Sequence, residues 1–439
     1  MRSWEVFLHI RYLNRTQWGS PQDIRRIQLE KLKALIKHAY ENVPFYHRKF
    51  SELKLKPRDI KCLRDLEKLP ILTKDDLRGN FPDTLARNYN IKILKRRSTS
   101  GSTGKPLEIY EDKWAIWRDW SAYYRFASWC GFYPTDKMVS ITTARPWSYL
   151  SFSLSTRLGN ICRRWLQLTA YRMNEQTLHD ISITLRRFKP KILRGFTSPI
   201  FLLADFLRRT DINEISPIAV VTTGETLQGF QRRLIESIFN CRVYNFYGSN
   251  EIQSIAQECP ERSGLHINAE NRIVEFVRGS ENASSGEEGE IIITDLNNFA
   301  MPLIRYNMED VGTPSNEPCM CGRGLPLIKE LRGRVCDLIV GKDGTLFAGE
   351  FFALPAPYIL KNYEWIQQFQ IFQPSREELV IKIIKSTEPK NHDLEYLTNR
   401  IRKYLGDIEV KIEFVESIPT ASKHRFTISK VTQELFRRN

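Results

Sequence analysis

The sequence contains no apolar run of the roughly 20 residues that a membrane-spanning helix needs. Its first residues lead into no apolar segment with a small-residue cleavage site, and it has only eight cysteines in 439 residues. These absences argue against a secretory signal and against a disulfide framework. The sequence also has no internal repeat, no low-complexity tract and no recognised nucleic-acid-binding motif. We therefore expect a cytoplasmic protein without a transmembrane segment, and we expect no nucleic-acid partner.

Positive charge, in contrast, is in excess. The formal net charge is +15, and the lysines and arginines are spread along the whole chain. Such a charge fits a solvated basic surface, and it also fits attraction to anions such as a nucleotide, CoA, nucleic acid or a membrane surface. Hydrophobic content of 41% and charged content of 27% are ordinary for a globular protein, and the length favours two or three domains.

The most informative stretch is a polar loop between two expected strands, residues 91–95 and 107–110. It consists of Thr99, Ser100, Gly101, Ser102, Thr103, Gly104 and Lys105, and Pro106 follows it. Glycines let backbone N–H groups approach an anion, hydroxyls donate further hydrogen bonds, and lysine adds a positive charge. The loop is not a Walker A motif, because its glycines are too close together and proline follows the lysine. It predicts a polyphosphate site, and a Ser/Gly-rich surface hairpin is the alternative.

The pattern of apolar residues predicts an α/β protein. Residues 1–65 and 113–130 have helical spacing, and the second of these helices is rich in aromatic residues. Helices and strands alternate over 174–247, which is typical of a parallel sheet covered by helices. From residue 272 the strands become antiparallel, and strands near 366–372, 378–384 and 409–415 with a helix at 392–405 indicate a small α+β unit.

Two polar segments follow strands of the expected parallel sheet. Thr223-Gly224-Glu225 follows one strand, and Tyr247-Gly248-Ser249-Asn250-Glu251 begins at the end of the next. Ligands of such sheets bind at the carboxyl ends of the strands. Trp147, Gly195, Phe196 and Thr223 are our guess for an organic-acid pocket, from their places at strand ends.

Several motifs, in order along the chain, resemble those of the adenylate-forming (acyl-CoA synthetase/ligase) superfamily. They are the loop at 99–106, the segment 247–251, residues 301–306 followed by Asp310, Gly333-Arg334 with Asp337, and Lys423 in Ser422-Lys423-His424. The N-terminal helices and the Cys-x-Cys-Gly-Arg at 319–323 are most similar to the phenylacetate–CoA ligase/CapK-like branch. The resemblance implies a large N-terminal domain, 1–333, with mixed and parallel sheets, helices and a β subdomain, opened by the helical segment 1–65. It also implies a small mobile α+β C-terminal domain, 334–439.

The resemblance implies an enzyme, an acid–thiol ligase or a related AMP-forming ligase. A small carboxylic acid would attack the α-phosphorus of ATP, and the acyl-adenylate would then be transferred, with CoA as the expected acceptor. An amine, a carrier-protein thiol or a sugar is the alternative acceptor, in surface-polysaccharide or secondary metabolism. A non-catalytic nucleotide- or polyanion-binding protein is the alternative of another class. The acid and the oligomeric state stay open.

Roles for single residues follow from the same resemblance. The loop at 99–105 would hold pyrophosphate, Glu251 would bind Mg²⁺, and Lys423 would bridge carboxylate and phosphate in the transition state. The expected adenine and ribose site consists of Gly224, Glu225, Tyr247, Gly248, Ser249, Asn250, Asp310 and Arg334. Glu251 as the cap of a following helix and Asp310 as a turn residue are the structural alternatives.

The sequence departs from the superfamily pattern at several positions. Asn250 stands where threonine is usual, Glu309 where glycine is usual, Cys336 replaces an acidic hinge residue, and Ser422 replaces glycine. These departures indicate a divergent member.

A second cluster has the chemistry of a metal site. Cys319 and Cys321 form a tight thiol pair, and Cys259 and His266 supply two further donors. Three thiolates and an imidazole are a suitable tetrahedral set for structural Zn²⁺. Two free thiols on a surface loop are the alternative.

Overall fold

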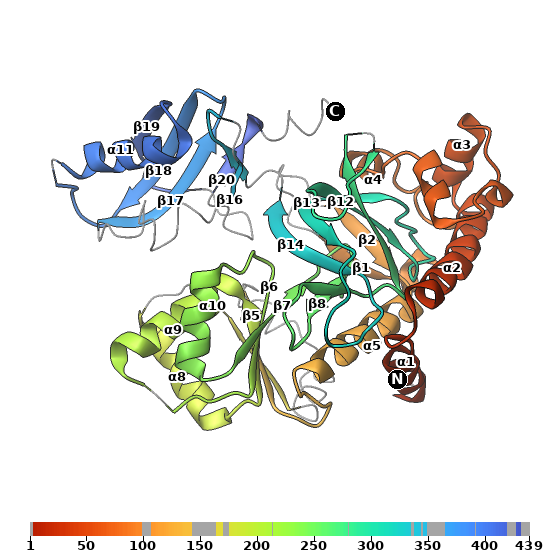
Figure 1. Cartoon of the computed structure of the whole chain (residues 1–439), viewed down its shortest axis with the longest axis horizontal. Coiled ribbons are helices and arrows are strands. Elements are labelled where there is room, and N and C mark those ends of the chain that lie inside the picture. The colour runs from red at the N-terminus through yellow and green to blue at the C-terminus, as the bar shows by residue number, and fades with distance from the viewer. Residues whose placement is uncertain are drawn as a thin grey trace.

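The computed structural model describes residues 3–98, 107–142, 164–169, 175–212, 214–279, 281–334, 338–343, 346–348, 365–390, 392–418 and 427–431. Figure 1 shows the N-terminal helices at one side of a large sheet, a second group of helices at the other end of that sheet, and the C-terminal strands apart from both. The expected α/β class is confirmed. Within the described residues, no helix combines the length and apolarity needed to span a bilayer.

The helical N-terminal segment is confirmed. It contains α1 (Ser3–Thr16), α2 (Pro21–Asn42) and α3 (Pro44–Glu52), then short helices at Pro57–Asp59, Leu63–Lys68 and α4 (Lys74–Gly79). Ser20 begins α2 as a capping box, because its hydroxyl accepts from Asp23 N while the Asp23 carboxylate accepts from Ser20 N. Ile24, Leu32, Leu35, Ile36 and Ala39 lie on the buried face of this helix. The aromatic helix α5 (Lys113–Trp129) follows as expected.

Twelve described strands form one sheet. In spatial order they are β11 (Glu281–Asn282), β10 (Arg272–Arg278), β12 (Gly289–Asp295), β13 (Tyr306–Ser315), β14 (Leu327–Arg334), β9 (Leu265–Ile267), β8 (Ala256–Glu258), β7 (Arg242–Tyr247), β6 (Ala219–Thr223), β5 (Ile192–Phe196), β3 (Met138–Thr142) and β4 (Trp165–Thr169). Strands β7, β6, β5, β3 and β4 are parallel, and the neighbours from β8 to β11 pair antiparallel. The expected change from a parallel to an antiparallel sheet is therefore confirmed, but it begins at β8 and not at residue 272.

The parallel part of the sheet has two different faces. Val139, Leu193, Val220 and Val243 belong to the core with α8 (Glu175–Phe188), α9 (Thr197–Thr210) and α10 (Gly229–Phe239). The alternate residues Met138, Ile192, Val221 and Phe246 belong to the core that contains the aromatic side chains of α5. Successive side chains of a strand point to opposite faces, so one sequence pattern supplies both cores.

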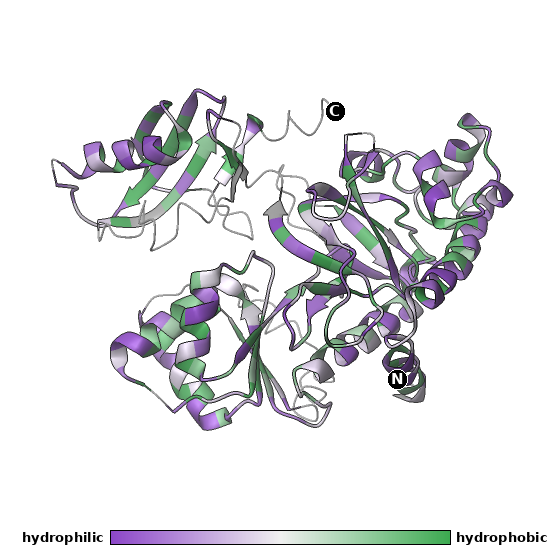
Figure 2. Cartoon of the chain, viewed as in Figure 1, coloured by the Kyte–Doolittle hydropathy of each residue, from purple (hydrophilic) through white to green (hydrophobic). Residues whose placement is uncertain are grey.

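The C-terminal unit has its own four-stranded sheet and core. The spatial order is β19 (Glu409–Phe414), β18 (Glu378–Lys385), β17 (Ile366–Gln373) and β20 (Thr427–Ser429), and α11 (Asp393–Leu405) packs on it. A separate hairpin pairs β15 (Leu338–Val340) with β16 (Leu346–Ala348). Figure 2 shows hydrophobic bands along β17 and β18 and mainly hydrophilic residues on α11. The domain boundary at 333/334 stays a prediction.

Two expectations for individual strands were wrong or incomplete. Residues Ile91–Ile93 form a 3₁₀ turn instead of a strand, because the Asn90 side chain accepts from Lys92 N and caps that turn. Strand β1 is Lys95–Ser98, and it pairs antiparallel with β2 (Glu108–Glu111). Strand β4 was not expected, although it pairs with β3 along its whole length.

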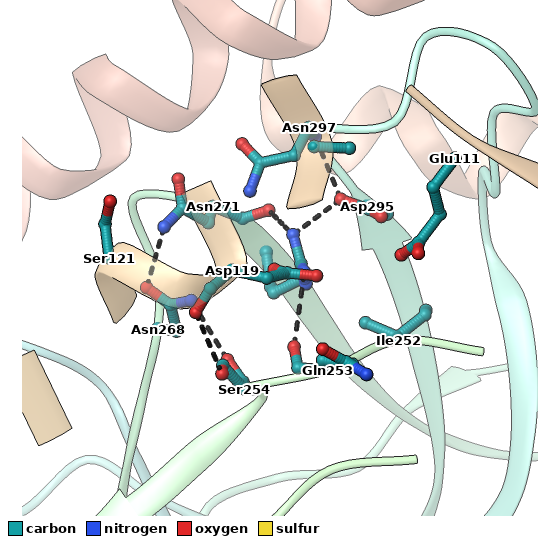
Figure 3. A network of polar contacts seen from close by, with 12 residues as sticks. Glu111, Asp119, Ser121, Ile252, Gln253, Ser254, Asn268, Asn271, Asp295 and Asn297 are labelled. Atoms are coloured by element: carbon teal, nitrogen blue, oxygen red, sulfur yellow. Dashed lines mark hydrogen bonds and ion pairs between the residues drawn. The ribbon is translucent and has the colours of Figure 1, made fainter. Parts of the chain in front are cut away.

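A buried ionic network joins α5 to the antiparallel part of the sheet (Figure 3). Arg272, which is fully buried, donates to Asp295 Oδ1 at 2.5 Å and to Asp119, a residue of α5. Beside it, Arg125 of α5 donates to Glu270 Oε1 at 2.7 Å and to Asn268 Oδ1 at 2.8 Å. Burial raises the pKa of the Asp119 carboxyl to about 7, although Arg272 opposes this shift. The network therefore places several charges in a low-dielectric interior where each depends on its partners.

Removal of the Arg272 guanidinium should destabilise the protein strongly. Arg272→Met leaves Asp119 and Asp295 buried without their cation, and we expect the free energy of unfolding to fall by about 3–5 kcal/mol. Urea unfolding followed by circular dichroism would measure this. Arg278→Met, at the exposed end of the same strand, is the matched control and should change stability by less than about 0.5 kcal/mol. Equal midpoints for the two variants would contradict the importance of the network.

Candidate active site

Three of the predicted nucleotide segments meet at the carboxyl ends of the parallel strands β6 and β7. Thr223 and Phe246 are register partners, so the segments 223–225 and 247–251 leave adjacent strands β6 and β7 side by side. The Tyr247 hydroxyl donates to Asp310 Oδ2 at 2.7 Å in a buried contact. Asp310 is in turn the register partner of Arg334 across β13 and β14. The carboxyl ends of the parallel strands therefore lie beside the expected ribose-binding residues.

The turn after β7 is fixed by the Ser249 side chain. Its hydroxyl accepts from the backbone N–H groups of Glu251 and Ile252, each at 3.1 Å, while Ser249 N donates to Ile252 O. A side chain at position 248 would be crowded, because a Cβ would lie 3.1 Å from the Phe246 ring and 3.2 Å from Ser254 N. Asn250 is exposed at the tip of the turn.

Glu251 is the buried carboxylate of this turn. It is 6% exposed, and its side chain makes no hydrogen bond or ion pair with any part of the chain that the structure describes. The element that follows is β8 and not a helix, so the alternative role as a helix cap does not apply. A buried carboxylate without a cationic partner has the chemistry of a metal ligand, and Mg²⁺ prefers such hard oxygen donors.

The base of the phosphate-loop hairpin lies next to the same turn. Residues 99–105 and Pro106 lie outside the described residues, but β1 and β2 on either side of them are described. Arg97 on β1 pairs with the Glu111 carboxylate on β2. With the amide orientation that satisfies both groups, the Gln253 side-chain oxygen accepts from Arg97 Nη1 at 2.6 Å. Gln253 is two residues from Glu251, so the hairpin and the Glu251 turn are held together.

Asp310 is a strand residue and not a turn residue. It lies within β13 and is 8% exposed, which removes the structural alternative. The backbone of Arg334 ends β14, whereas Asp337, Cys336, Ser422 and Lys423 lie outside the described residues. The roles of Arg334 and Lys423 therefore stay predictions.

The guessed acid pocket is only partly brought together. Phe196 lies against Gly224, where φ is +78° and a Cβ would be 2.2 Å from the Phe196 ring, so only glycine fits. Thr223 is the last residue of β6 and directly precedes Gly224. Gly195 differs, because its absent side chain would meet Ile141 and Ile200 on the α9 side of the sheet. Trp147 lies outside the described residues.

An arginine that the sequence-based prediction missed lies on the other face of the sheet. The Arg194 guanidinium carbon is 4.8 Å from the Tyr123 ring centroid and 4.9 Å from that of Phe246. Burial raises the pKa of the Tyr123 hydroxyl to about 12, and Arg194 partly opposes this. The missed signal is a charged residue in the middle of Ile192-Leu193-Arg194-Gly195-Phe196, a parallel strand that is otherwise apolar.

The four predicted metal ligands come together in a second cluster. It is formed by the residue after β8, by strand β9 and by the loop between β13 and β14. The Sγ atoms of Cys259, Cys319 and Cys321 and a ring nitrogen of His266 all lie within 4.8 Å of one another. Cys259 Sγ and Cys319 Sγ are 3.6 Å apart, and Cys321 Sγ is 3.3 Å from His266 Nε2. Sulfur atoms around a tetrahedral zinc ion are separated by about 3.8 Å, so the spacing suits that ion.

The surroundings of this cluster orient its imidazole. His266 Nδ1 lies 3.4 Å from Leu325 O, which leaves Nε2 for the sulfur side. Burial lowers the pKa of His266 to about 4, so the ring is neutral near pH 7, the form that binds a metal. The neighbouring Arg323 stacks between Trp18 and Trp129 and donates to Gln17 Oε1 at 3.2 Å. The cluster therefore borders the loop between α1 and α2.

Comparison with known proteins agrees with this geometry. Residues 354–430 match the model of the CapK C-terminal domain. The chain is 30% identical over 357 residues to phenylacetate–coenzyme A ligase of Escherichia coli K12, covering 77% of each chain. It is 25% identical over 415 residues to Protein CapK of Staphylococcus aureus, covering 93% of this chain and 90% of that protein.

Solved structures show the same fold. A structure of 2-hydroxyisobutyryl-CoA ligase in the postadenylation state, in complex with R3-HIB-AMP, superposes with a TM-score of 0.72. The match has 21% sequence identity and covers 97% of this chain and 93% of that one. The expected resemblance is confirmed, and the chain belongs to the phenylacetate–CoA ligase family of adenylate-forming enzymes.

Proposed function

We propose that the protein activates a small carboxylic acid with ATP and transfers the acyl group to the thiol of CoA. The observation that carries this proposal is the Tyr247–Asp310 hydrogen bond, which joins the end of a parallel strand to the expected ribose segment. The Glu251 carboxylate, which has no partner among the described residues, lies four residues beyond Tyr247 in the turn after that strand. Family membership supports the same chemistry.

The proposed reaction has two steps. A carboxylate oxygen of the acid attacks the α-phosphorus of ATP, the bond to the β-phosphate oxygen breaks, and pyrophosphate leaves. The sulfur of CoA then attacks the acyl carbon, and AMP leaves. Both steps depend mainly on orientation and on neutralisation of negative charge.

Each expected site residue would have a defined part in this scheme. Tyr247 and the backbone around Gly224 and Glu225 bind adenine, Asp310 accepts from the ribose hydroxyls, and Arg334 lies beside Asp310. The loop at 99–105 binds the departing phosphates, and Lys423 bridges carboxylate and phosphate. Glu251 would hold Mg²⁺, which when bound would supply positive charge beside the phosphates.

Acid-dependent ATP–pyrophosphate exchange tests the first step. We expect exchange with at least one acid from a panel of aromatic and aliphatic carboxylates. Glu251→Gln should lower the exchange rate by about 100-fold or more, because it removes the charge that binds the metal. Lys423→Ala should lose exchange while ATP still binds.

Glu261→Gln is the matched control, because Glu261 is an exposed glutamate ten positions along the chain. Its exchange rate should equal that of the original protein. Absence of exchange with every acid, or full exchange in Glu251→Gln, would contradict the proposal. Exchange without thioester formation would indicate an acceptor other than CoA, such as an amine, a carrier-protein thiol or a sugar.

The Tyr247–Asp310 contact predicts a milder and more specific effect. Tyr247→Phe keeps the ring against adenine but removes the hydroxyl that holds Asp310. We expect the KM for ATP to rise about 5-fold to 10-fold, the equivalent of one hydrogen bond of ~1–1.5 kcal/mol, with the KM for the acid unchanged. Steady-state kinetics measure both constants. Tyr244→Phe, on the same strand, is the control, and equal constants for the two variants would contradict the assigned role.

The cysteine–histidine cluster is proposed as a structural zinc site. Cys259, His266, Cys319 and Cys321 form a closed donor set with no open position for a substrate. Bound zinc would link the end of β8, β9 and the β13–β14 loop, and this loop contacts the α1–α2 connection. Its proposed role is therefore stability of the N-terminal helices against the sheet and not catalysis.

Zinc content should follow this donor set. We expect about one equivalent of zinc in the purified protein by elemental analysis, and a lower melting temperature after chelation. Cys319→Ser should lose the metal, because a hydroxyl replaces a thiolate ligand. Cys62→Ser is the control, since Cys62 is an exposed free cysteine. Zinc far below one equivalent in a protein that Cys319→Ser leaves equally stable would rule the site out.

A further inference from the structure

Arg194 is a cation with no acidic partner in the part of the chain that the structure describes. It lies on β5, its backbone opposite Ser140 of β3 and Val221 of β6. Among the residues that the structure describes, no carboxylate forms an ion pair with it, and its Nε–H group is buried without a hydrogen-bond partner. Arg97 and Arg232, which are partly buried, and Arg305, which is buried, each do have such a carboxylate.

Aromatic rings surround this guanidinium. Tyr123 and Phe246, both buried, lie within 5 Å of it. Around Tyr123, three further rings are only half-buried: Trp120, Tyr124 and Trp165. We call Arg194 with these five rings the aromatic box. Ring faces attract a cation but provide few acceptors for its N–H groups.

The box lies close to the proposed reaction site. Arg194 precedes Phe196 by two positions on β5, and side chains two apart on a strand share a face. Phe196 contacts Gly224, which follows the end of β6. Two residues of a strand span about 7 Å, which is close to the length of a benzene ring with a substituent at each end.

These observations assign the class of acid, given the proposed function on which this inference rests. We propose that the substrate carries a second anionic group, a carboxylate, at the end opposite to the one that is activated. The second carboxylate accepts hydrogen bonds from the Arg194 guanidinium, and the apolar body of the acid packs against the rings of the aromatic box. A guanidinium and a carboxylate match in both charge and geometry.

Matched acid pairs test the proposal. ATP–pyrophosphate exchange would be measured with phenylacetate against 4-carboxyphenylacetate, and with hexanoate against adipate. We expect KM at least about 10-fold lower for the diacid of each pair, the usual effect of a charge-assisted hydrogen bond. Arg194→Met should raise KM for the diacids by at least that factor, with kcat nearly unchanged, and leave the monoacids within about 2-fold.

Two further variants separate this role from a purely structural one. Arg194→Lys keeps the charge and should retain part of the diacid preference. Arg187→Met removes an exposed arginine from α8 and should retain all of it. If Arg194→Met slows monoacids and diacids equally, or if the original protein prefers monoacids, the proposal is overturned.

Direct binding distinguishes failure of this inference from failure of the proposed function. Isothermal titration calorimetry with 4-carboxyphenylacetate needs no turnover. Arg194-dependent binding without exchange would support the aromatic box and contradict acid activation. Exchange with monoacids, without any Arg194-dependent binding of the diacid, would support activation and overturn the second-carboxylate site. Absence of both exchange and diacid binding would overturn both.

Discussion

The ion pairs of Arg272 with Asp119 and Asp295 are the constraint on which the rest of the structure depends. They connect α5, β10 and β12 in the buried interior, where an unpaired charge would be costly. The same guanidinium donates to Gln253 O, and the backbone carbonyl of Arg272 accepts from Gln28 of α2. The N-terminal helices, the antiparallel strands and the turn that contains Glu251 therefore share one anchor. Buried ion pairs add little net stability over apolar contacts, so we regard this anchor as a device that fixes relative position.

That anchor explains how loops can form a defined site. The Glu251 turn is fixed at one end by β7 and at the other by the contact of Gln253 with Arg272. Gln253 also meets Arg97 at the base of the phosphate-loop hairpin. Tyr247 fixes Asp310 across the junction between the parallel and antiparallel strands. The proposed site thus lies where the sheet changes from parallel to antiparallel pairing, and both halves contribute polar groups that a single parallel sheet would not bring together.

Much of the fold follows from local sequence patterns. The helical spacing over 1–65 and 113–130 and the alternation over 174–247 are local signals, and each predicted the observed elements. Strand β4 was missed because its alternation, Leu166-Gln167-Leu168, is very short, and the turn at Ile91–Ile93 depends on a single Asn90 side chain. For the site, strand ends and ordered motifs indicated residues 223–225, 247–251 and Asp310. The Tyr247–Asp310 bond, the Arg97–Gln253 contact and the aromatic box join residues far apart in the chain, and no local pattern specifies them.

The departure at Glu309 illustrates how the chain compensates for an unusual residue. Glycine is usual at this position, and the backbone gives the reason, because φ of Glu309 is +58°, a conformation that side chains rarely adopt. Two contacts offset this strain: Asn307 Oδ1 accepts from Glu309 N at 2.7 Å, and Lys74 of α4 pairs with the Glu309 carboxylate at 2.5 Å. Lys74 is mostly buried, so the pair is shielded from solvent more than a surface pair would be. The glutamate thereby ties α4 to β13 directly beside Asp310. The unusual residue at 309 preserves the backbone conformation that glycine allows and adds a link between the N-terminal segment and the proposed nucleotide site.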